Sequence, residues 1–207
     1  MPLTGGERCE REGEEMKTCM FKVIVFLILA LNSYIPVNAA EIIIQHSRYD
    51  PAIIVNSMYP IGQTFKAEDQ HISAIGFWLI DFNPQYEPIS VNIELFSGVG
   101  IYGQSLGIAP VEGLAPGFNG FYDADFNFVN LTPGEIYTAI VSSPNARPGL
   151  SYRQWRNEYG QILAPDPYID GDFVIRGNIN YNRDAIFRVI PEPATLLLLG
   201  LGSLALL

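Results

Sequence analysis

A serine between two glycines is the first candidate for catalysis. Residues 103–107 read GQSLG and match the G-x-S-x-G pattern, in which a tight strand-to-helix turn exposes a nucleophilic serine, here Ser105. No helical pattern follows this stretch. Both histidines, His46 and His71, precede the serine, whereas a hydrolase of that class needs its histidine after it. We therefore interpret the stretch as a turn-rich surface hairpin.

Paired carboxylates could hydrolyse a glycoside if they stood ~5 to 9.5 Å apart across a sugar. Asp123 and Asp125 share one face of a predicted strand with Asn127, because side chains alternate along a strand. The other face carries Tyr122, Ala124, Phe126 and Phe128. Such a pattern is typical of a hydrated strand surface, and the two histidines are too few and too far apart for an ordinary zinc site. We predict that the protein is not an enzyme.

Three carboxylates gather around a glycine in the stretch DPYIDGD, residues 166–172. Asp166, Asp170 and Asp172 could supply oxygens to calcium, which takes six to eight of them. The spacing departs from the EF-hand pattern, and Asp and Gly are also the ordinary residues of turns. A plain turn is the favoured interpretation. The alternative is a calcium ion that holds a loop in place and takes no part in chemistry; no other cofactor is expected.

Two tryptophans could serve as flat platforms for a sugar ring, which has one apolar face. Trp78 stands beside a glycine in a predicted strand with apolar residues on both faces, a setting that also indicates burial. Trp155 lies in the polar stretch YRQWRNEY, residues 152–159, and on a strand it would share a face with Arg153. We expect Trp155 to be the better candidate for contact with a ligand. The alternative is an indole that caps one end of the fold.

These side chains must be positioned by short strands. Residues 89–95, ISVNIEL, alternate apolar and polar, as in a strand with one face on a core and the other in water. Gly, Pro, Asn and Asp separate similar stretches without an amphipathic helix, which predicts an all-β fold, an antiparallel β-sandwich of jelly-roll type. Residues 131–135, LTPGE, predict a type II turn that joins two strands as a hairpin. Further strands are expected at Glu41–Gln45, Gly62–Lys66, Ile72–Ile80, Gly120–Val129, Ile136–Val141, Phe173–Arg176 and Ala185–Ile190.

The N-terminal residues have the three-part pattern of a secretory signal peptide. A basic region from Met16 to Lys22 precedes the apolar segment 23–31, and small residues then favour cleavage between Ala39 and Ala40. We predict that residues 16–39 form a signal helix that is removed; the alternative is a retained membrane helix. Residues 1–15 carry five acids and two bases, the wrong sign for such a region, and are interpreted as an extension from a misassigned start codon.

Cleavage there would leave residues 40–190 as one exported domain. Both cysteines, Cys9 and Cys19, precede the cleavage point, so neither a disulfide nor a catalytic thiol is expected. The domain carries sixteen acids against eight bases. A nucleic-acid partner is unexpected, because phosphate binding relies on clustered Lys and Arg. Calcium or a neutral sugar suits this charge better.

The C-terminal tail, residues 191–207, reads PEPATLLLLGLGSLALL. Its apolar run from Ala194 has fourteen residues, short of the ~20 of a spanning helix. Pro191, Glu192 and Pro193, followed by Ala-Thr and a Leu/Gly run, resemble the PEP-CTERM sorting signal of Gram-negative bacteria. The resemblance implies transient attachment to the inner membrane through a short apolar helix, and cutting at the motif by an exosortase. The family pattern ends in an Arg cluster, which is missing here, and processing without it stays open.

The stretch Tyr59–Val189 looks like the jelly-roll modules of exported bacterial surface proteins, which resemble carbohydrate-binding modules. Its segments QTF, LTPGEIYTAIV, YRQW, DPYIDGDF and DAIFRV carry this likeness. The resemblance implies a fold and transfers no binding residue. Three classes stay open for a protein of the cell surface or extracellular matrix. These are a binder of extracellular polysaccharide, a structural protein without ligand and, least favoured, a hydrolase.

Overall fold

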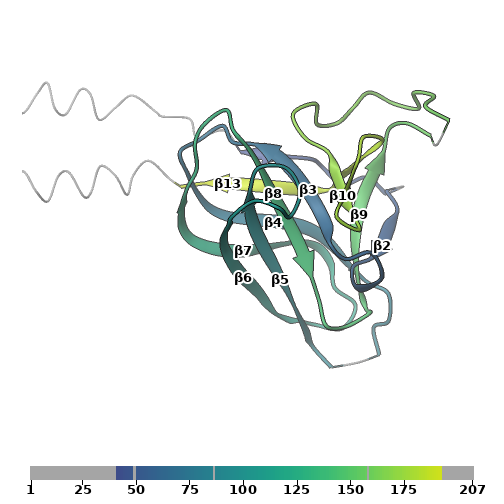
Figure 1. The fold of residues 1–207 in the computed structure, drawn as a ribbon. Helices are drawn as coiled ribbons and strands as arrows, with labels where there is room; N and C mark the ends of the chain where they lie inside the picture. The colour runs from purple at the N-terminus through teal and green to yellow at the C-terminus, as the bar shows by residue number, and fades with distance from the viewer. Residues whose placement is uncertain (1–40, 49, 86, 158, 193–207) are drawn as a thin grey trace, which may run out of the picture. The chain divides into compact units, whose positions relative to one another are not determined.

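The computed structural model describes residues 41–192 except 49, 86 and 158. Within this part the chain forms thirteen strands and one short 3-10 helix, η1 (Asn56–Met58) (Figure 1). The strands are β1 (Ile42–Ile43), β2 (Ala52–Ile54), β3 (Ile61–Lys66), β4 (His71–Asp81), β5 (Ile89–Ser97), β6 (Ser105–Leu114), β7 (Asn119–Asn130), β8 (Ile136–Ser142), β9 (Pro148–Gln154), β10 (Phe173–Ile175), β11 (Asn178–Asn180), β12 (Arg183–Ala185) and β13 (Phe187–Pro191). No helix in the described residues is long and apolar enough to cross a membrane. The expected signal helix, its cleavage residues Ala39 and Ala40 and the apolar C-terminal helix lie outside the described residues.

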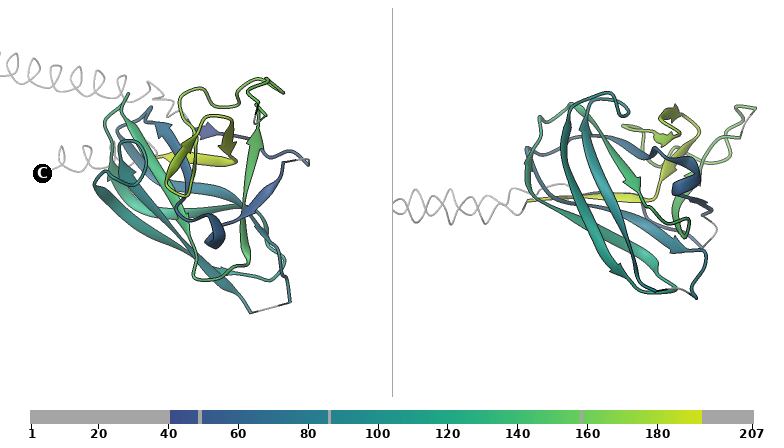
Figure 2. Two further views of the ribbon diagram at one scale, coloured as in Figure 1. Left: turned by 45° about the vertical axis from the view of Figure 1, so that its right-hand side comes forward. Right: turned by 60° about the horizontal axis from the view of Figure 1, so that its bottom comes forward.

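The strands form two antiparallel sheets that pack face to face (Figure 2). The seven-stranded sheet has the order β1-β13-β4-β9-β12, with β2 paired to β9 and β7 paired to β4. The six-stranded sheet has the order β11-β10-β3-β8-β5-β6. The prediction of an all-β sandwich is therefore confirmed.

Alternation along the strands builds the core. In β5 the apolar positions Ile89, Val91, Ile93 and Leu95 are all buried, while Ser90 between them is exposed. Burying one such side chain contributes about 1.5–3 kcal/mol. The sequence of β5 therefore decides both that a strand forms here and which face it turns inward.

The turn at residues 132–135 has the predicted type but a different role. Gly134 has φ 87°, and the Glu135 N–H donates to the Thr132 carbonyl at 3.1 Å, as in a type II turn. The strands on either side are not partners, because β7 pairs with β4 and β8 pairs with β3 and β5. The predicted hairpin is therefore wrong. A turn fixes the local reversal of the chain, whereas burial of the flanking apolar faces fixes the partner, and here the chain crosses between sheets.

Candidate binding cleft

An open cleft of about 420 Å³ lies on the outer face of the six-stranded sheet. Strand β3 turns Ile61 and Phe65 into the core and Thr64 and Lys66 to the opposite face, where Thr64 is covered and Lys66 is exposed opposite Ile136 of β8. Thr64, Lys66 and Ile136 line the cleft from this sheet. Its other lining residues come from separate segments of the chain: Val99, Gly134, Ile169, Asp170, Gly171, Asp172, Ile179 and Tyr181.

One wall of the cleft belongs to the segment between β9 and β10, residues 155–172, which we call the wall loop. It is the long excursion at the upper right of Figure 1. The Tyr168 hydroxyl accepts the Lys66 N–H at 3.1 Å, and the Thr64 N–H donates to the Asp172 carbonyl at 2.9 Å. Gly171 lies so close to β3 that a Cβ there would be 2.0 Å from the Thr64 carbonyl oxygen. The C-terminal part of the loop is thus fixed to β3 by hydrogen bonds and by the close approach of Gly171.

The β5–β6 loop supplies another part of the wall. The buried Thr138 hydroxyl accepts the Gly100 N–H at 2.8 Å and donates to the Gly98 carbonyl at 2.7 Å. Gly98 and Gly100 both have φ 76°, a left-handed conformation that favours glycine. This fold-back places the exposed Val99 at the cleft.

The cleft combines apolar surface with unused hydrogen-bonding groups. Tyr181 and Ile169 are 65% and 85% exposed. Lys66 and Asp170 form an ion pair at 3.7 Å with side chains about half exposed, a type of pair worth little in water. Burial and the nearby Asp166 raise the pKa of Asp172. Among the described residues no side chain donates a hydrogen bond to the Asp172 carboxylate, so its oxygens can accept from a ligand.

Trp155, expected as an exposed platform, is only 9% exposed. The Arg156 guanidinium lies 4.6 Å from the centre of its ring, and the Leu163 N–H donates to the Trp155 carbonyl at 2.8 Å. Strand β9 ends at Gln154, so strand alternation does not extend to Arg156, which folds over the indole. The neighbouring Arg153 pairs with Asp50 at 2.8 Å. The expectation that Trp155 is exposed is therefore wrong, and Arg153 is engaged by Asp50.

Trp78 lies on the outer face of β4, opposite to the core residues of the same strand. His46 stacks on it with ring centres 4.1 Å apart and an interplanar angle of 8°. Phe121 meets the indole edge-on, with ring centres 5.3 Å apart. The Nε1–H of Trp78 donates to the Asn119 side-chain oxygen at 2.8 Å. The indole is therefore engaged within the protein on this face.

The acids of β7 lie on an exposed face, as predicted, and serve structural contacts. The Asp123 carboxylate accepts the Arg188 Nε–H at 2.8 Å above Gly76, where a Cβ would be 2.0 Å from Asp123 Oδ1. Asn127 and Phe128 have φ 48° and 74°, and the pairing of β7 with β4 shifts register there. This irregularity turns Phe128 outward, 47% exposed, so its predicted inward position is wrong.

The remaining candidates separate in space. Ser105 begins the edge strand β6, and its hydroxyl donates to the Glu94 carboxylate at 2.7 Å, so it does not stand at a strand-to-helix turn. Asp170 pairs with Lys66, Asp172 lines the cleft, and Asp166 accepts the Tyr168 N–H at 2.9 Å. In the described ranges no three His, Cys, Asp or Glu residues form a group able to hold a metal ion. Calcium binding stays a prediction.

The C-terminal triplet begins inside the sandwich. Pro191 belongs to β13 and lies opposite Ile72, and the Glu192 N–H donates to the His71 carbonyl at 3.1 Å. Pro193 lies outside the described residues. The last strand therefore extends one residue beyond the expected boundary at Ile190.

Two buried polar side chains, Gln63 and Asp184, were not identified from the sequence. Gln63 lies between Ile61 and Phe65 on the inward face of β3. Its place in this alternation could have predicted a polar side chain in the core. Asp184 gave no such sign, because its short strand β12 shows no alternation.

The fold defines this chain as an antiparallel β-sandwich protein. No protein-family model matches the chain, and no curated protein matches it significantly. The features that bear on its function are therefore the cleft and the sequence patterns before residue 40 and after residue 190.

Proposed function

We propose that this protein is an exported β-sandwich of jelly-roll type that binds exopolysaccharide in the open cleft, without enzymatic turnover. The observation that carries the proposal is the lining of the cleft, in which the exposed Tyr181 and the Asp172 carboxylate, to which no described side chain donates a hydrogen bond, share one open surface. A sugar presents apolar C–H faces and a rim of hydroxyl donors, and sites that bind such ligands combine apolar surface with a few placed polar groups.

A structural surface protein without ligand is the second candidate. It is favoured by the fact that both tryptophans are engaged within the protein, Trp78 by His46 and Trp155 by Arg156. The two candidates differ in whether the cleft has measurable affinity for polysaccharide.

Tyr181→Ala and Asp172→Asn are each expected to weaken polysaccharide binding by roughly fivefold. An aromatic contact or a hydrogen bond of this kind contributes about 1 kcal/mol. Exopolysaccharide extracted from the source bacterium would be titrated into the purified protein by calorimetry.

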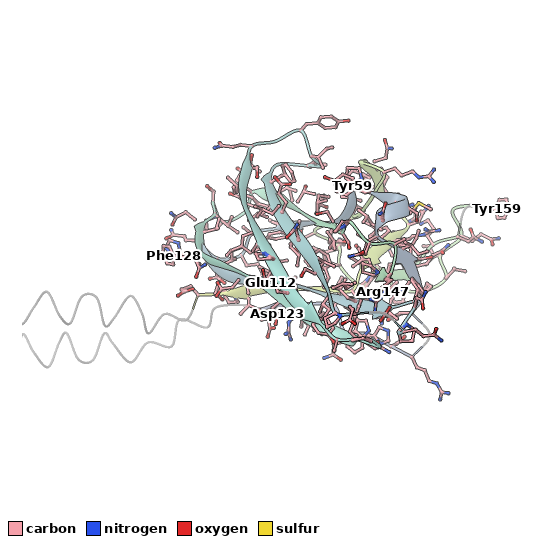
Figure 3. All side chains as sticks on the ribbon, turned by 90° about the horizontal axis from the view of Figure 1, so that it is seen from below. Tyr59, Glu112, Asp123, Phe128, Arg147 and Tyr159 are labelled. Carbon is pink, nitrogen blue, oxygen red and sulfur yellow. The ribbon has the colours of Figure 1, made fainter. Side chains whose placement is uncertain are left out.

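Tyr159→Ala is the matched control for the cleft. This tyrosine is 82% exposed at the tip of the wall loop, points away from the sandwich (Figure 3) and does not line the cleft. Its replacement should leave affinity unchanged. Equal losses for Tyr159→Ala and Tyr181→Ala would place binding elsewhere, and no wild-type binding would favour the ligand-free role.

We further propose that the chain is exported by signal peptidase cleavage between Ala39 and Ala40, attaches transiently to the inner membrane, and is released to the cell surface or matrix by an exosortase. Support comes from the resemblance of residues 191–207 to the PEP-CTERM signal and from the signal-peptide pattern before residue 40. The acidic balance of the domain is consistent with a partner other than nucleic acid.

The combined replacement Glu192→Ala and Pro193→Ala should keep the protein in the membrane fraction of its host, because the exosortase motif is lost while the apolar tail remains. Pro191 is left in place because it pairs within β13. The amounts in membrane and medium would be compared by immunoblotting with those of Glu112→Ala with Pro116→Ala, an exposed acid and proline of the sandwich. Unchanged release of the tail variant would show that the triplet is only a linker.

A further inference from the structure

Asp184 of β12 is a fully buried carboxyl group with only one of its oxygens bonded. Oδ1 accepts the Gln63 Nε2–H at 2.9 Å, and Gln63 Oε1 accepts the Ala185 N–H at 2.7 Å, so the glutamine fixes both the side chain and the backbone of β12. In the described part of the chain, no donor reaches Oδ2. A buried polar atom without a partner costs about 1–3 kcal/mol, more if it is charged.

The Asp166 carboxyl of the wall loop is a hydrogen-bonding neighbour of Asp184 that raises the pKa of Asp184. Asp166 Oδ1 accepts the Tyr168 N–H at 2.9 Å. Because burial raises the pKa of Asp184 to about 8, this carboxyl group keeps its proton at neutral pH and can donate it to the Asp166 carboxylate. The oxygen of Asp184 that receives no hydrogen bond is thus used as a donor.

The charged and titratable groups around the pair do not replace that proton. Asp172 of the wall loop adds a further negative charge, and Tyr168 lies near enough for Asp184 to raise its pKa. Arg153, opposite Asp184 in the pairing of β12 with β9, is ion-paired with Asp50 at 2.8 Å. Burial raises the pKa of Asp184 to about 8; the Gln63 hydrogen bond opposes this shift, and Asp166 and Asp172 add to it.

We propose that the proton shared by Asp166 and Asp184 clasps the wall loop to the sandwich, so that the cleft loses its ligand when the pair ionises fully. Asp166 lies in the same loop as Ile169, Asp170 and Asp172, which line the cleft. With the proton gone, repulsion from Asp184 pushes Asp166 outward and strains the neighbouring contact between Tyr168 and Lys66. The effect on ligand binding rests on the proposed function, whereas the clasp can be measured without any ligand.

The direction of the pH effect follows from proton linkage. An aspartate ordinarily titrates near 3.8, and Asp184 holds its proton in the fold up to about pH 8. Between these values the folded protein binds one proton more than the unfolded chain, so stability falls as pH rises from about 4 to 8 and levels off above. In Asp184→Asn the amide can donate to Asp166 while its oxygen still accepts from Gln63, which imitates the protonated acid at every pH.

The test compares thermal melts of the full chain from pH 5 to 9.5, and hydrogen exchange of residues 155–172 at pH 6.5 and 9. The wild-type melting temperature should fall by roughly 5 °C or more across this range, and exchange in the wall loop should rise at pH 9. Asp184→Asn should show less than half of either change. If Asp184→Asn does not fold, Asp166→Asn replaces it in the exchange experiment only, because the buried Asp184 still titrates in this variant. Without a charge on residue 166 to be repelled, exchange of residues 155–172 should rise at pH 9 by less than half of the wild-type change.

Equal pH dependence in the wild type and in both variants would overturn the clasp. Calcium chloride and a chelator form separate arms. If calcium restores the wild-type melting temperature at pH 9 and has no effect on Asp184→Asn, a cation and not a proton joins the carboxylates, and the proposal fails. If the melts follow expectation but extracted exopolysaccharide binds at neither pH, the proposed function fails and the clasp stands. If polysaccharide binds equally at pH 6.5 and 9 and exchange of residues 155–172 does not change, the clasp fails and the proposed function stands.

Discussion

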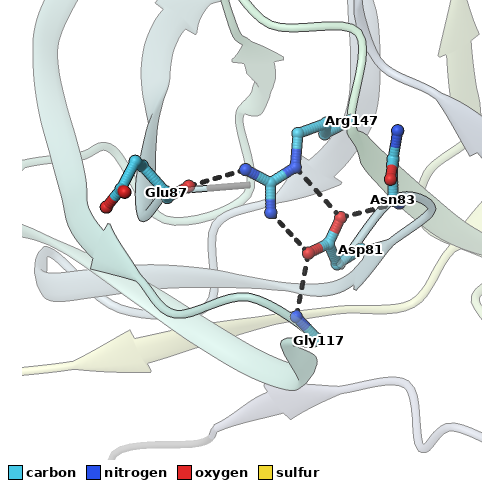
Figure 4. A network of polar contacts seen from close by, with 5 residues as sticks. All are labelled: Asp81, Asn83, Glu87, Gly117 and Arg147. Carbon is cyan, nitrogen blue, oxygen red and sulfur yellow. Dashed lines mark hydrogen bonds and ion pairs between the residues drawn. The ribbon is translucent and has the colours of Figure 1, made fainter. Parts of the chain in front are cut away.

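Arg147→Met is expected to lower the free energy of unfolding by about 3–5 kcal/mol, because it leaves the buried Asp81 carboxylate without its cation. Arg147 Nη2 lies 2.6 Å from Asp81 Oδ2, Nε donates to Oδ1 at 3.3 Å, and Nη1 donates to the Glu87 carbonyl at 2.6 Å (Figure 4). The Asp81 side chain is fully buried and that of Arg147 is 10% exposed. Because both side chains are shielded from water, removing only one of them leaves the other charge buried without a partner and destabilises the fold.

The pH dependence of this loss gives a second readout. Burial works to raise the pKa of Asp81, but the hydrogen bonds from Arg147, Gly117 and Asn83 outweigh it, and the pKa is lowered overall. This pair therefore stabilises the wild type above about pH 4, and its contribution is lost as pH falls through the lowered pKa. The difference between Arg147→Met and the wild type should be largest at neutral pH and shrink in acid.

Urea unfolding at pH 7 and pH 3 would measure both effects. Arg48→Met, at an exposed arginine, is the control and should change stability by no more than about 0.5 kcal/mol. Combining Asp81→Asn with Arg147→Met should recover part of the loss, since neither charge is then left alone. A loss for Arg147→Met no larger than that for Arg48→Met would contradict the role of the pair.

The strands that could be predicted are those whose residues alternate. Residues 89–95 became β5 because their apolar positions repeat every second residue. Residues 72–80, which became β4, carry apolar side chains on both faces, and within them the buried Ile75, Phe77 and Leu79 repeat every second residue. Strand β6 was missed because its sequence, SLGIAPVEGL, is interrupted by glycine and proline, which an edge strand can tolerate. Strands β2 and β11 have three residues each, too few for a pattern to emerge.

The cleft could be predicted only in part, because it is assembled from distant segments. The acids at residues 166–172 indicated a polar loop, but nothing local placed Lys66, Val99 or Tyr181 beside them. Trp155 was misjudged because polar neighbours in sequence do not show which of them folds back over an indole. The partner of Asp184, Gln63, is 121 residues away, and such pairings become visible only when the two sheets are stacked.

Phe187→Ala should also cost about 3–5 kcal/mol, the usual range for emptying a buried aromatic site. Phe187 is fully buried, with ring centres 6.3 Å from Phe65 of the opposite sheet and 6.2 Å from Phe77 of its own. Tyr168 of the wall loop meets the same ring edge-on at 5.4 Å. One side chain thus joins both sheets of the sandwich to the wall of the cleft.

Because of this shared position, Phe187→Ala should loosen the wall loop as well as the core. Thermal melts would be combined with hydrogen exchange of residues 155–172. Phe187→Leu should keep most of the stability and most of the protection of the wall loop from exchange, at a cost of roughly 1 kcal/mol. Phe128→Ala, at the outward-turned phenylalanine of β7, is the control and should cost less than about 1 kcal/mol without changing exchange in the loop. If Phe187→Ala lowered stability but left that exchange unchanged, the loop would be held by its polar contacts alone, and Tyr168 would contribute through its hydroxyl and not through its ring.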